Sequence, residues 1–327
     1  MTDTAQRQPI RRATSATVWR TGLALAGLTA LVSGVSVFVN GYGVARFDDA
    51  TTYTTAKNLV AAVLVTAILV VQRRRGSPAP ATSPQTSPIT GRPRTVFALA
   101  AVAVIGGSVP FVLFFEGLAR VSSNDAAFIH KTLVAWVAIL AVLFLGERVS
   151  APHLAAIALI LAGYAQLAGG VGLPEIGTGE TLILAATLCW SVEVVLVRSL
   201  LRRGVPEMVV STSRMAGGIV LLLCWAIVRG ALGDLIGLSA TQWAWTLLTG
   251  LLLAAYVVSW HHALARAPAI DVTAVLSMGA VLTALLNTGV RGAVLQPVGL
   301  ALLVAGGLLI VWASGVASRT PHEVATP

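Results

Sequence analysis

Ten long apolar segments follow one another along this chain of 327 residues. Most of them reach the ~20 residues that a helix needs to cross ~30 Å of hydrocarbon. A chain in lipid must satisfy its backbone polar groups within helices or a closed barrel, and strand-like alternation is absent here. The sequence therefore predicts an all-α membrane protein with ten transmembrane helices, with expected bounds 21–43, 53–71, 96–117, 124–145, 151–169, 180–200, 208–228, 241–263, 271–290 and 297–316.

The composition excludes a soluble domain. Only 11% of the residues are charged and the mean hydropathy is +0.85, whereas soluble domains have about 25% charged residues. The net charge of +9 could suggest a nucleic-acid partner, but its placement argues against one. Outside the segments or at their edges, fifteen arginines lie on the side of the membrane that holds the N-terminus and only four lie on the opposite side. This positive-inside bias predicts a multi-pass plasma-membrane protein with both termini in the cytoplasm.

Three stretches outside the segments are polar. Residues 1–20 and 317–327 are predicted cytoplasmic tails, and residues 1–15 are expected to be flexible. Residues 72–94 contain the proline-rich run "GSPAPATSPQTSPITGRP" and predict a disordered cytoplasmic loop.

The chain also repeats itself. "GLARVSSNDAA" (117–127) resembles "ALARAPAIDVT" (263–273) at an offset of 146, which aligns Gly146 with Gly292. Nearer the start of each half, "TTAKNLVAAVLV" (54–65) resembles "STSRMAGGIVLL" (211–222) at an offset of 157.

Five helices per repeat is an odd number, so the second copy must cross the membrane upside down. Inverted repeats are typical of secondary transporters, whose substrate site lies near the bilayer midplane between the halves. The sequence predicts these repeats at 21–169 and 179–316.

The segment "VPFVLFFEGLARVSSNDAAFIHKTLVAWVAILAVLFLGERVSAPHLAAIALILAGY" (109–164) resembles the first half of the EamA family of the drug/metabolite transporter superfamily. The run Gly146-Glu147-Arg148 and the small-residue helix that ends at Leu161-Ala162-Gly163 carry most of this resemblance. "TLILAATLCWSVEVVLVRSLLRRG" (181–204) resembles the helix that opens a repeat of that family.

The resemblance spans about 21–316 and implies two inverted five-helix halves around a central cavity, lined chiefly by helices 1, 3, 4, 6, 8 and 9. It also implies transport of small metabolites, often export. The second half departs from the pattern, because it has Gly292-Ala293 where the first has Gly146-Glu147.

Ionisable residues within the segments are candidates for the substrate pathway, because a charge at the bilayer centre costs ~2.5–3.5 kcal/mol. Lys131 lies about two turns into the fourth segment, in "FIHKTLVAW". We expect it to face the cavity and to hold an anionic substrate group or a carboxylate such as Glu116; a structural ion pair is the alternative. His130 points ~100° away from Lys131 and is a second-rank candidate.

Glu193 lies in the middle of the sixth segment, with no cation at helical spacing until Arg198. Burial disfavours the charged form of a carboxylate, so Glu193 could exchange a proton or bind a cationic substrate. A neutral, hydrogen-bonded contact between helices explains it equally well.

Four further residues complete the candidate pathway. Glu116 precedes Arg120 by one turn, so a surface ion pair explains it, while its repeat counterpart His262 would allow gating or proton coupling. Asn40 could line the cavity or bond a neighbouring helix. Pro110 should kink the third helix, which would suit gating.

Other polar residues have plainer interpretations. Lys57 and Arg214 are expected to extend their side chains to the membrane interface. Asp125 and Asp271 are expected to cap the helices that they open. The glycine pairs are expected to allow close helix packing; they are Gly106-Gly107, Gly217-Gly218 and Gly306-Gly307.

The sequence therefore predicts a secondary transporter that exports small metabolites or drug-like compounds by alternating access, with proton coupling as an option. The alternative is a non-transporting membrane sensor or a channel with the same fold. The chain shows no Walker motif, nucleophile elbow or Cys/His metal spacing, so we expect no enzyme activity, catalytic residue, cofactor or metal. The expected partners are a small-molecule substrate, the lipid bilayer and a second copy in a homodimer, but no nucleic acid.

Overall fold

The computed structural model describes residues 7–75, 92–121, 123–167 and 177–317, and this part of the chain is helical without strands. In chain order the helices are α1 (Arg7–Val44), α2 (Ala50–Arg74), α3 (Pro93–Gly107), α4 (Val109–Leu118), α5 (Ser123–Lys131), α6 (Leu133–Leu140), the π-helical turn η2 (Ala141–Leu145), α7 (Ala151–Leu167), α8 (Thr178–Arg202), α9 (Glu207–Thr212), the π-helical turn η3 (Ser213–Gly217), α10 (Gly218–Val228), α11 (Leu232–Ile236), α12 (Ala240–Arg266), α13 (Ala269–Leu276), α14 (Gly279–Arg291) and α15 (Pro297–Ala317).

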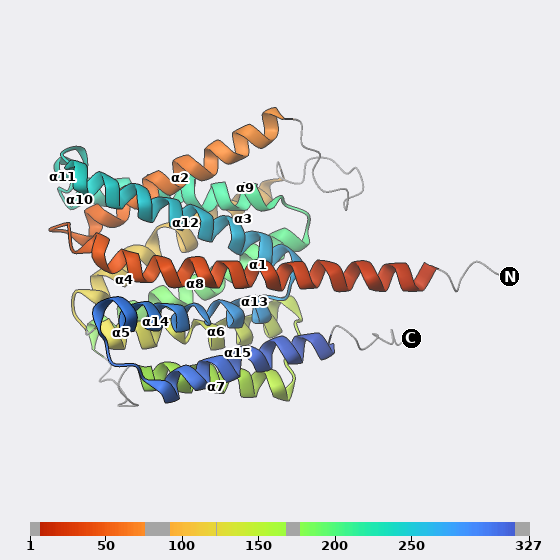
Figure 1. The fold of residues 1–327 in the computed structure, drawn as a ribbon. Helices are drawn as coiled ribbons and strands as arrows, with labels where there is room; N and C mark the ends of the chain where they lie inside the picture. The colour runs from red at the N-terminus through yellow and green to blue at the C-terminus, as the bar shows by residue number, and fades with distance from the viewer. Residues whose placement is uncertain (1–6, 76–91, 122, 168–176, 318–327) are drawn as a thin grey trace.

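Nine helical stretches of the described residues are long and apolar enough to cross a membrane, and α7 is a shorter apolar helix of 17 residues. Four of the nine are interrupted: α3 with α4, α5 with α6 and η2, α9 with η3 and α10, and α13 with α14. α7 packs along α15 (Figure 1). The predicted all-α membrane fold with ten helices in two inverted repeats is confirmed.

The element boundaries reproduce the predicted repeat. α5 and α13 begin 146 residues apart, as do α7 and α15, while α2 and α9 begin 157 residues apart. Gly146 and Gly292 both end a helix in the left-handed conformation, with φ values of 63° and 68°. This conformation favours glycine because it has no Cβ.

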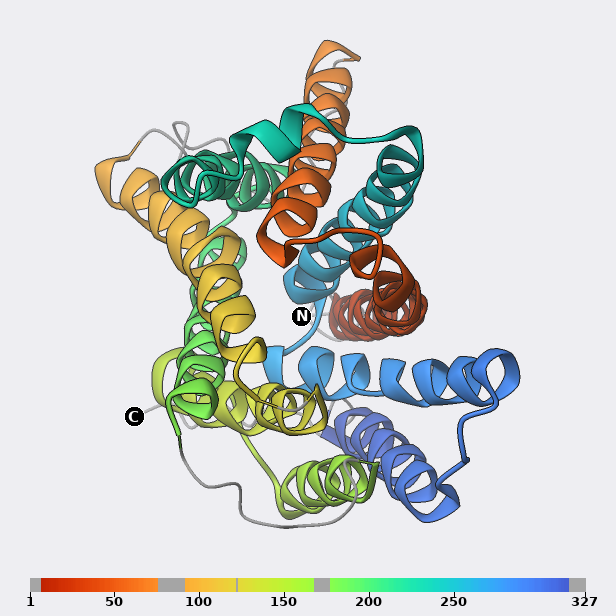
Figure 2. The same ribbon diagram turned by 90° about the vertical axis from the view of Figure 1, so that its left-hand side faces the viewer.

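Each half packs its opening helix on the other half. α1 lies against α12, α13 and α14, and α8 lies reciprocally against α3, α4, α5 and α6. Viewed end-on, α1 and α8 lie on different sides of the molecule, and α7 and α15 form a separate pair (Figure 2). The described chain ends, Arg7 and Ala317, lie towards the same end of the molecule (Figure 1).

The predicted tails and loop differ from the structure in extent. α1 already begins at Arg7, so it includes residues 7–15 of the segment that was expected to be flexible. α2 continues to Arg74 and α3 begins at Pro93, so both margins of the predicted loop 72–94 are helical. Residues 76–91 of that loop and 318–327 of the second tail lie outside the described residues.

Glycines allow close helix contacts, as predicted. A Cβ on Gly107 would overlap the carbonyl oxygen of Arg214 and come within 3.0 Å of Gly218 Cα. A Cβ on Gly306 would lie 2.8 Å from Ile160 Cγ1. These contacts bring α3 against η3 and α10, and they bring α15 against α7.

We expect Gly107→Ala to destabilise the protein by about 1–3 kcal/mol, because the new methyl group meets backbone atoms that cannot move aside. Gly27→Ala is the matched control, since a Cβ there has no atom within 4 Å. Thermal unfolding in detergent should show a lower midpoint for Gly107→Ala alone. Equal midpoints for the two variants would contradict the close contact.

Candidate functional site

A break in the third span exposes one backbone carbonyl to side chains of the other repeat. Pro110 has no N–H, so it cannot donate to the carbonyl oxygen of Gly106 four residues earlier. The helix is interrupted at Ser108, as the kink expected from Pro110 requires. Trp190 Nε1 donates to Gly106 O at 3.2 Å, and Arg214 Nε approaches the same oxygen at 3.4 Å.

Glu193 is ion-paired beside this carbonyl. Its Oε1 lies 3.5 Å from Arg214 Nε and 3.8 Å from His261 Nε2, and all three side chains are buried. His261 Nδ1 lies 2.8 Å from Ser211 Oγ. The expectation that Arg214 reaches the membrane interface is wrong, because the buried Glu193 carboxylate and the Gly106 carbonyl oxygen hold it inside.

Lys57, the repeat counterpart of Arg214, also contacts a polar side chain of the helix that opens its half. Asn40 Oδ1 accepts hydrogen bonds from Lys57 Nζ at 2.9 Å and from Tyr53 Oη at 2.6 Å. Asn40 Nδ2 donates to Ser36 O at 2.6 Å. No carboxylate of the described chain lies within 4 Å of Lys57 Nζ, so the first half places an amide where the second half places Glu193.

Lys131 lies where the broken helices of the two halves meet. It is the last residue of α5, and its Nζ lies 5.6 Å from the centre of the Tyr164 ring. Tyr164 Oη donates at 2.8 Å to Ser277 O, at the break between α13 and α14. Within the described residues no carboxylate oxygen lies within 4 Å of Lys131 Nζ, so the ammonium has an aromatic neighbour but no counter-ion.

His130 points away from Lys131, as helical geometry predicts. Its ring centre lies 4.9 Å from that of Trp190 and 5.5 Å from that of Phe114. Its buried Nδ1 has no hydrogen-bond partner among the residues that the structure describes. The two neighbours therefore face different surroundings: His130 faces α4 and α8, and Lys131 faces α7.

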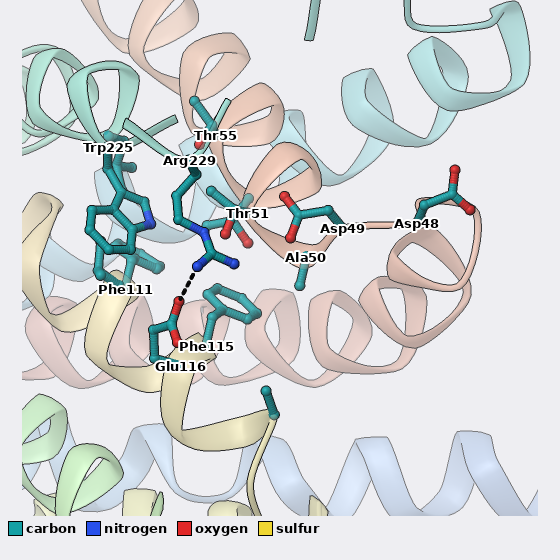
Figure 3. A pocket seen from close by; sticks show the side chains of 14 residues that line it. Asp48, Asp49, Ala50, Thr51, Thr55, Phe111, Phe115, Glu116, Trp225 and Arg229 are labelled. Atoms are coloured by element: carbon teal, nitrogen blue, oxygen red, sulfur yellow. Dashed lines mark ion pairs between the residues drawn. The ribbon is translucent and has the colours of Figure 1, made fainter. Parts of the chain in front are cut away.

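Glu116 does not pair with Lys131, which corrects that expectation. Its carboxylate lies 3.0 Å from Arg120 Nη1, as predicted, and 3.8 Å from Arg229 Nη1. Glu116 lines a pocket of about 280 Å³ between α2, α4 and α10, at the end of the molecule that holds the α1–α2 connection (Figure 3). We call this end the α1–α2 end.

His262, the repeat counterpart of Glu116, has a local contact. Its Nδ1 lies 2.8 Å from Val258 O one turn earlier in α12. His262 O in turn accepts a hydrogen bond from Arg266 Nη1. The structure thus does not join Glu116 and His262 in one site.

The opposite end of the molecule, which we call the Glu147 end, carries a polar clamp between the halves. Glu147 accepts hydrogen bonds from Ala269 N at 2.9 Å and Ile270 N at 3.2 Å, and it lies 3.6 Å from Arg198 Nε. Glu147 therefore caps α13, a role that we expected of Asp271. Asp271 instead lies 3.4 Å from His153 Nε2.

The sequence interpretation did not single out His261, Tyr164 or Glu147 for a polar network. The lysine content of the sequence was nevertheless unusual. The chain has only two lysines, Lys57 and Lys131, both within spans, and every other cationic side chain apart from histidine is arginine.

Comparisons with known proteins support a transporter. The model of the EamA-like transporter family matches residues 20–168 and again 177–312. A solved crystal structure shares 18% identity with the chain at a TM-score of 0.67, covering 93% of this chain and 99% of the other, and 29 solved chains match in all. This likeness concerns the fold alone. No match was found among curated proteins.

The buried pair generates a stability prediction. Arg214→Met should destabilise the protein by about 3–5 kcal/mol, because it leaves the Glu193 carboxylate buried without a counter-ion. Adding Glu193→Gln should restore much of that loss, because the remaining amide carries no charge. Thermal unfolding of the two single variants and the double variant measures the coupling. Purely additive effects would show that the pair is not coupled.

Proposed function

Because this chain belongs to the EamA-like transporter family, we propose that it exports a small metabolite or drug-like compound with an anionic group from the cytoplasm. Transport proceeds by alternating access between its two inverted halves. The positive-inside bias of the arginines supports a plasma-membrane orientation with the Glu147 end in the cytoplasm.

The observation that carries the sign of the substrate is the difference between Lys131 and Glu193. Arg214 lies 3.5 Å from Glu193 Oε1 and offsets its charge. Lys131 has no such partner among the described residues, and Tyr164 supplies only the face of a ring. An uncompensated ammonium within a membrane protein is costly, and an anionic group of the substrate would offset that cost.

The position of Lys131 also supports a role in transport. It directly precedes the break at Thr132, and Tyr164 connects it to the matching break at Ser277 in the other half. Helix breaks of this kind leave backbone N–H and C=O groups without helical partners, and near the midplane these groups can bind a substrate or coupling ion. A substrate bound at Lys131 would therefore contact both halves, whose relative movement alternating access requires.

Export is tested by untargeted mass spectrometry of medium and cytosol from cells that express wild type, Lys131→Met or Lys131→Arg in equal amounts. We expect wild type to move an anionic compound into the medium. Lys131→Met should reduce this at least about tenfold, since loss of one partner of a buried charge pair is costly, and Lys131→Arg should retain part of it. Arg75→Gln, at the exposed end of α2, is the control for loss of a positive charge.

The outcomes separate the alternatives. A compound that Lys131→Met still exports would retain the transporter and assign Lys131 a structural role. No compound shifted by wild type would favour the sensor or channel. Repeating the assay with the proton gradient collapsed tests coupling, because a proton-driven exporter would lose net export.

The two lysines allow a second test of access to Lys131. Formaldehyde with cyanoborohydride methylates amines, and we expect Lys131 to react faster than Lys57, whose Nζ is bonded to Asn40 Oδ1. Peptide mass spectrometry resolves the two methylated lysines. The signal that Lys131→Arg lacks is the one from Lys131. If Lys131 reacts only after the protein is unfolded, its amine is not accessible to water and the proposed role in transport is contradicted.

A further inference from the structure

Two acceptor atoms face each other in the buried cluster around Glu193. Glu193 Oε1 and His261 Nε2 lie 3.8 Å apart, which is longer than an N–H···O hydrogen bond of about 2.7–3.2 Å. Neither atom has a hydrogen-bond partner among the residues that the structure describes. Glu193 is 1% exposed and His261 is 0% exposed, so bulk water does not reach the pair.

Ser211 determines which nitrogen of His261 carries a hydrogen. Its hydroxyl oxygen lies 2.9 Å from Glu207 O and 2.8 Å from His261 Nδ1. A carbonyl oxygen can only accept, so the single hydroxyl hydrogen of Ser211 is donated to Glu207 O. His261 Nδ1 must then donate to Ser211 Oγ. The Nε2 atom of the neutral ring is thus left with a lone pair beside the Glu193 carboxylate, where two acceptors repel each other.

Gly106 of the first half makes room for this carboxylate. A Cβ at Gly106 would overlap Glu193 Cγ and would lie 3.0 Å from Oε1. The carbonyl oxygen of Gly106 accepts from Arg214 Nε at 3.4 Å, which is a long contact. The cluster therefore lies where α3 of the first half meets α8 and η3 of the second, and its charge acts on a contact between the halves.

The charged groups around His261 are balanced while its ring is neutral. Arg214 and Glu193 face it with one positive and one negative charge. His262 and Tyr256 are the other titratable groups near the cluster, and both lie on α12 itself. The ionisable side chains of the other elements packed on α12 have partners elsewhere, and the pairs are Lys57 with Asn40, Glu207 with Arg266, Arg198 with Glu147, and Asp271 with His153. One added proton would therefore give the cluster a net positive charge.

We propose that Glu193 Oε1 and His261 Nε2 bind one proton between them, and that this proton is the coupling ion of transport. The proton comes from water and binds the lone pair of Nε2, which turns the repulsion between two acceptors into a charge-assisted hydrogen bond. In so close a pair the proton belongs to both groups. The proton site stands on its own, whereas its role as coupling ion rests on the proposed function.

The added charge acts through Arg214. Once the proton neutralises the attraction of Glu193 for a second cation, Arg214 is held less firmly beside Glu193 Oε1 and Gly106 O, which it contacts at 3.5 and 3.4 Å. The contact between η3 and α3 then weakens. Proton binding would in this way favour movement of one half relative to the other, which alternating access requires.

Nitrogen-15 NMR of the purified full chain, labelled at its five histidines, tests the proton site without any cargo. The imidazole nitrogen shifts distinguish the two neutral tautomers from the protonated ring. We expect His261 in the Nδ1–H form at alkaline pH and a proton at Nε2 as the pH falls. The His261 signal is the one that His261→Gln lacks, and variants of the other four histidines assign it by elimination if that variant does not fold.

Two results would overturn the site. One is a hydrogen on Nε2 alone at alkaline pH, which would contradict the arrangement of Ser211. The other is an Nε2 atom that binds no proton at any pH at which the protein stays folded.

Glu193→Gln combined with Arg214→Met is the decisive variant, because it removes both buried charges and leaves an amide that can donate to His261 Nε2. Loss of the like charge of Arg214 by itself favours a protonated ring. A His261 ring that stays neutral in this double variant therefore identifies Glu193 as the second group that holds the proton. Glu180→Gln, at the start of the same helix α8, is the matched control and should titrate as wild type does. Equal titration of His261 in the double variant and in wild type would overturn the site.

The export assay tests the role as coupling ion, with cells that express wild type, His261→Gln or Glu180→Gln in equal amounts. We expect export by wild type and Glu180→Gln to rise as the medium is acidified, by up to about tenfold per pH unit while the site is unsaturated. Export by His261→Gln should not respond. Wild-type export that is independent of the external pH would overturn the coupling. If wild type exports no compound, the proposed function fails, and the NMR titration still decides the proton site.

Discussion

The carbonyl oxygen of Gly106 is the group around which the interior of the second half is arranged. Pro110 removes its helical donor, and lipid offers no water to replace that donor. Trp190 and Arg214 take its place, and Arg214 thereby comes beside Glu193. The N–H that is missing at Pro110 thus brings together side chains of α8 and η3.

The two repeats share a backbone plan but not a charge plan. In the second half a cation faces a carboxylate, whereas in the first half Lys57 faces the amide of Asn40. At the Glu147 end a carboxylate caps α13 across the two halves, and its repeat counterpart is Ala293, which has no such group. The two ends therefore have different polar contacts between the halves, although the backbone follows one inverted plan.

The sequence by itself determined the elements and their duplication. Apolar length requires membrane helices, and the offsets of 146 and 157 recur in the helix starts because equal sequence patterns end and begin helices at equal places. The sequence also predicted that Gly146 and Gly292 are repeat counterparts and that Pro110 interrupts its helix. A helix end at glycine and a helix break at proline both depend on the local backbone alone. The separation of His130 from Lys131 followed from helical geometry.

Only the tertiary structure decided which charges meet. Arg214 and Glu193 come from different spans, as do Glu147 and the start of α13, and spacing along the chain does not reveal such partners. The sequence therefore placed Arg214 at the interface, assigned the cap of α13 to Asp271 and gave Glu116 as one of two alternative partners for Lys131. Each of these assignments changed because a buried ion takes the partner that helix packing brings within a few ångströms, however distant that partner is in the sequence.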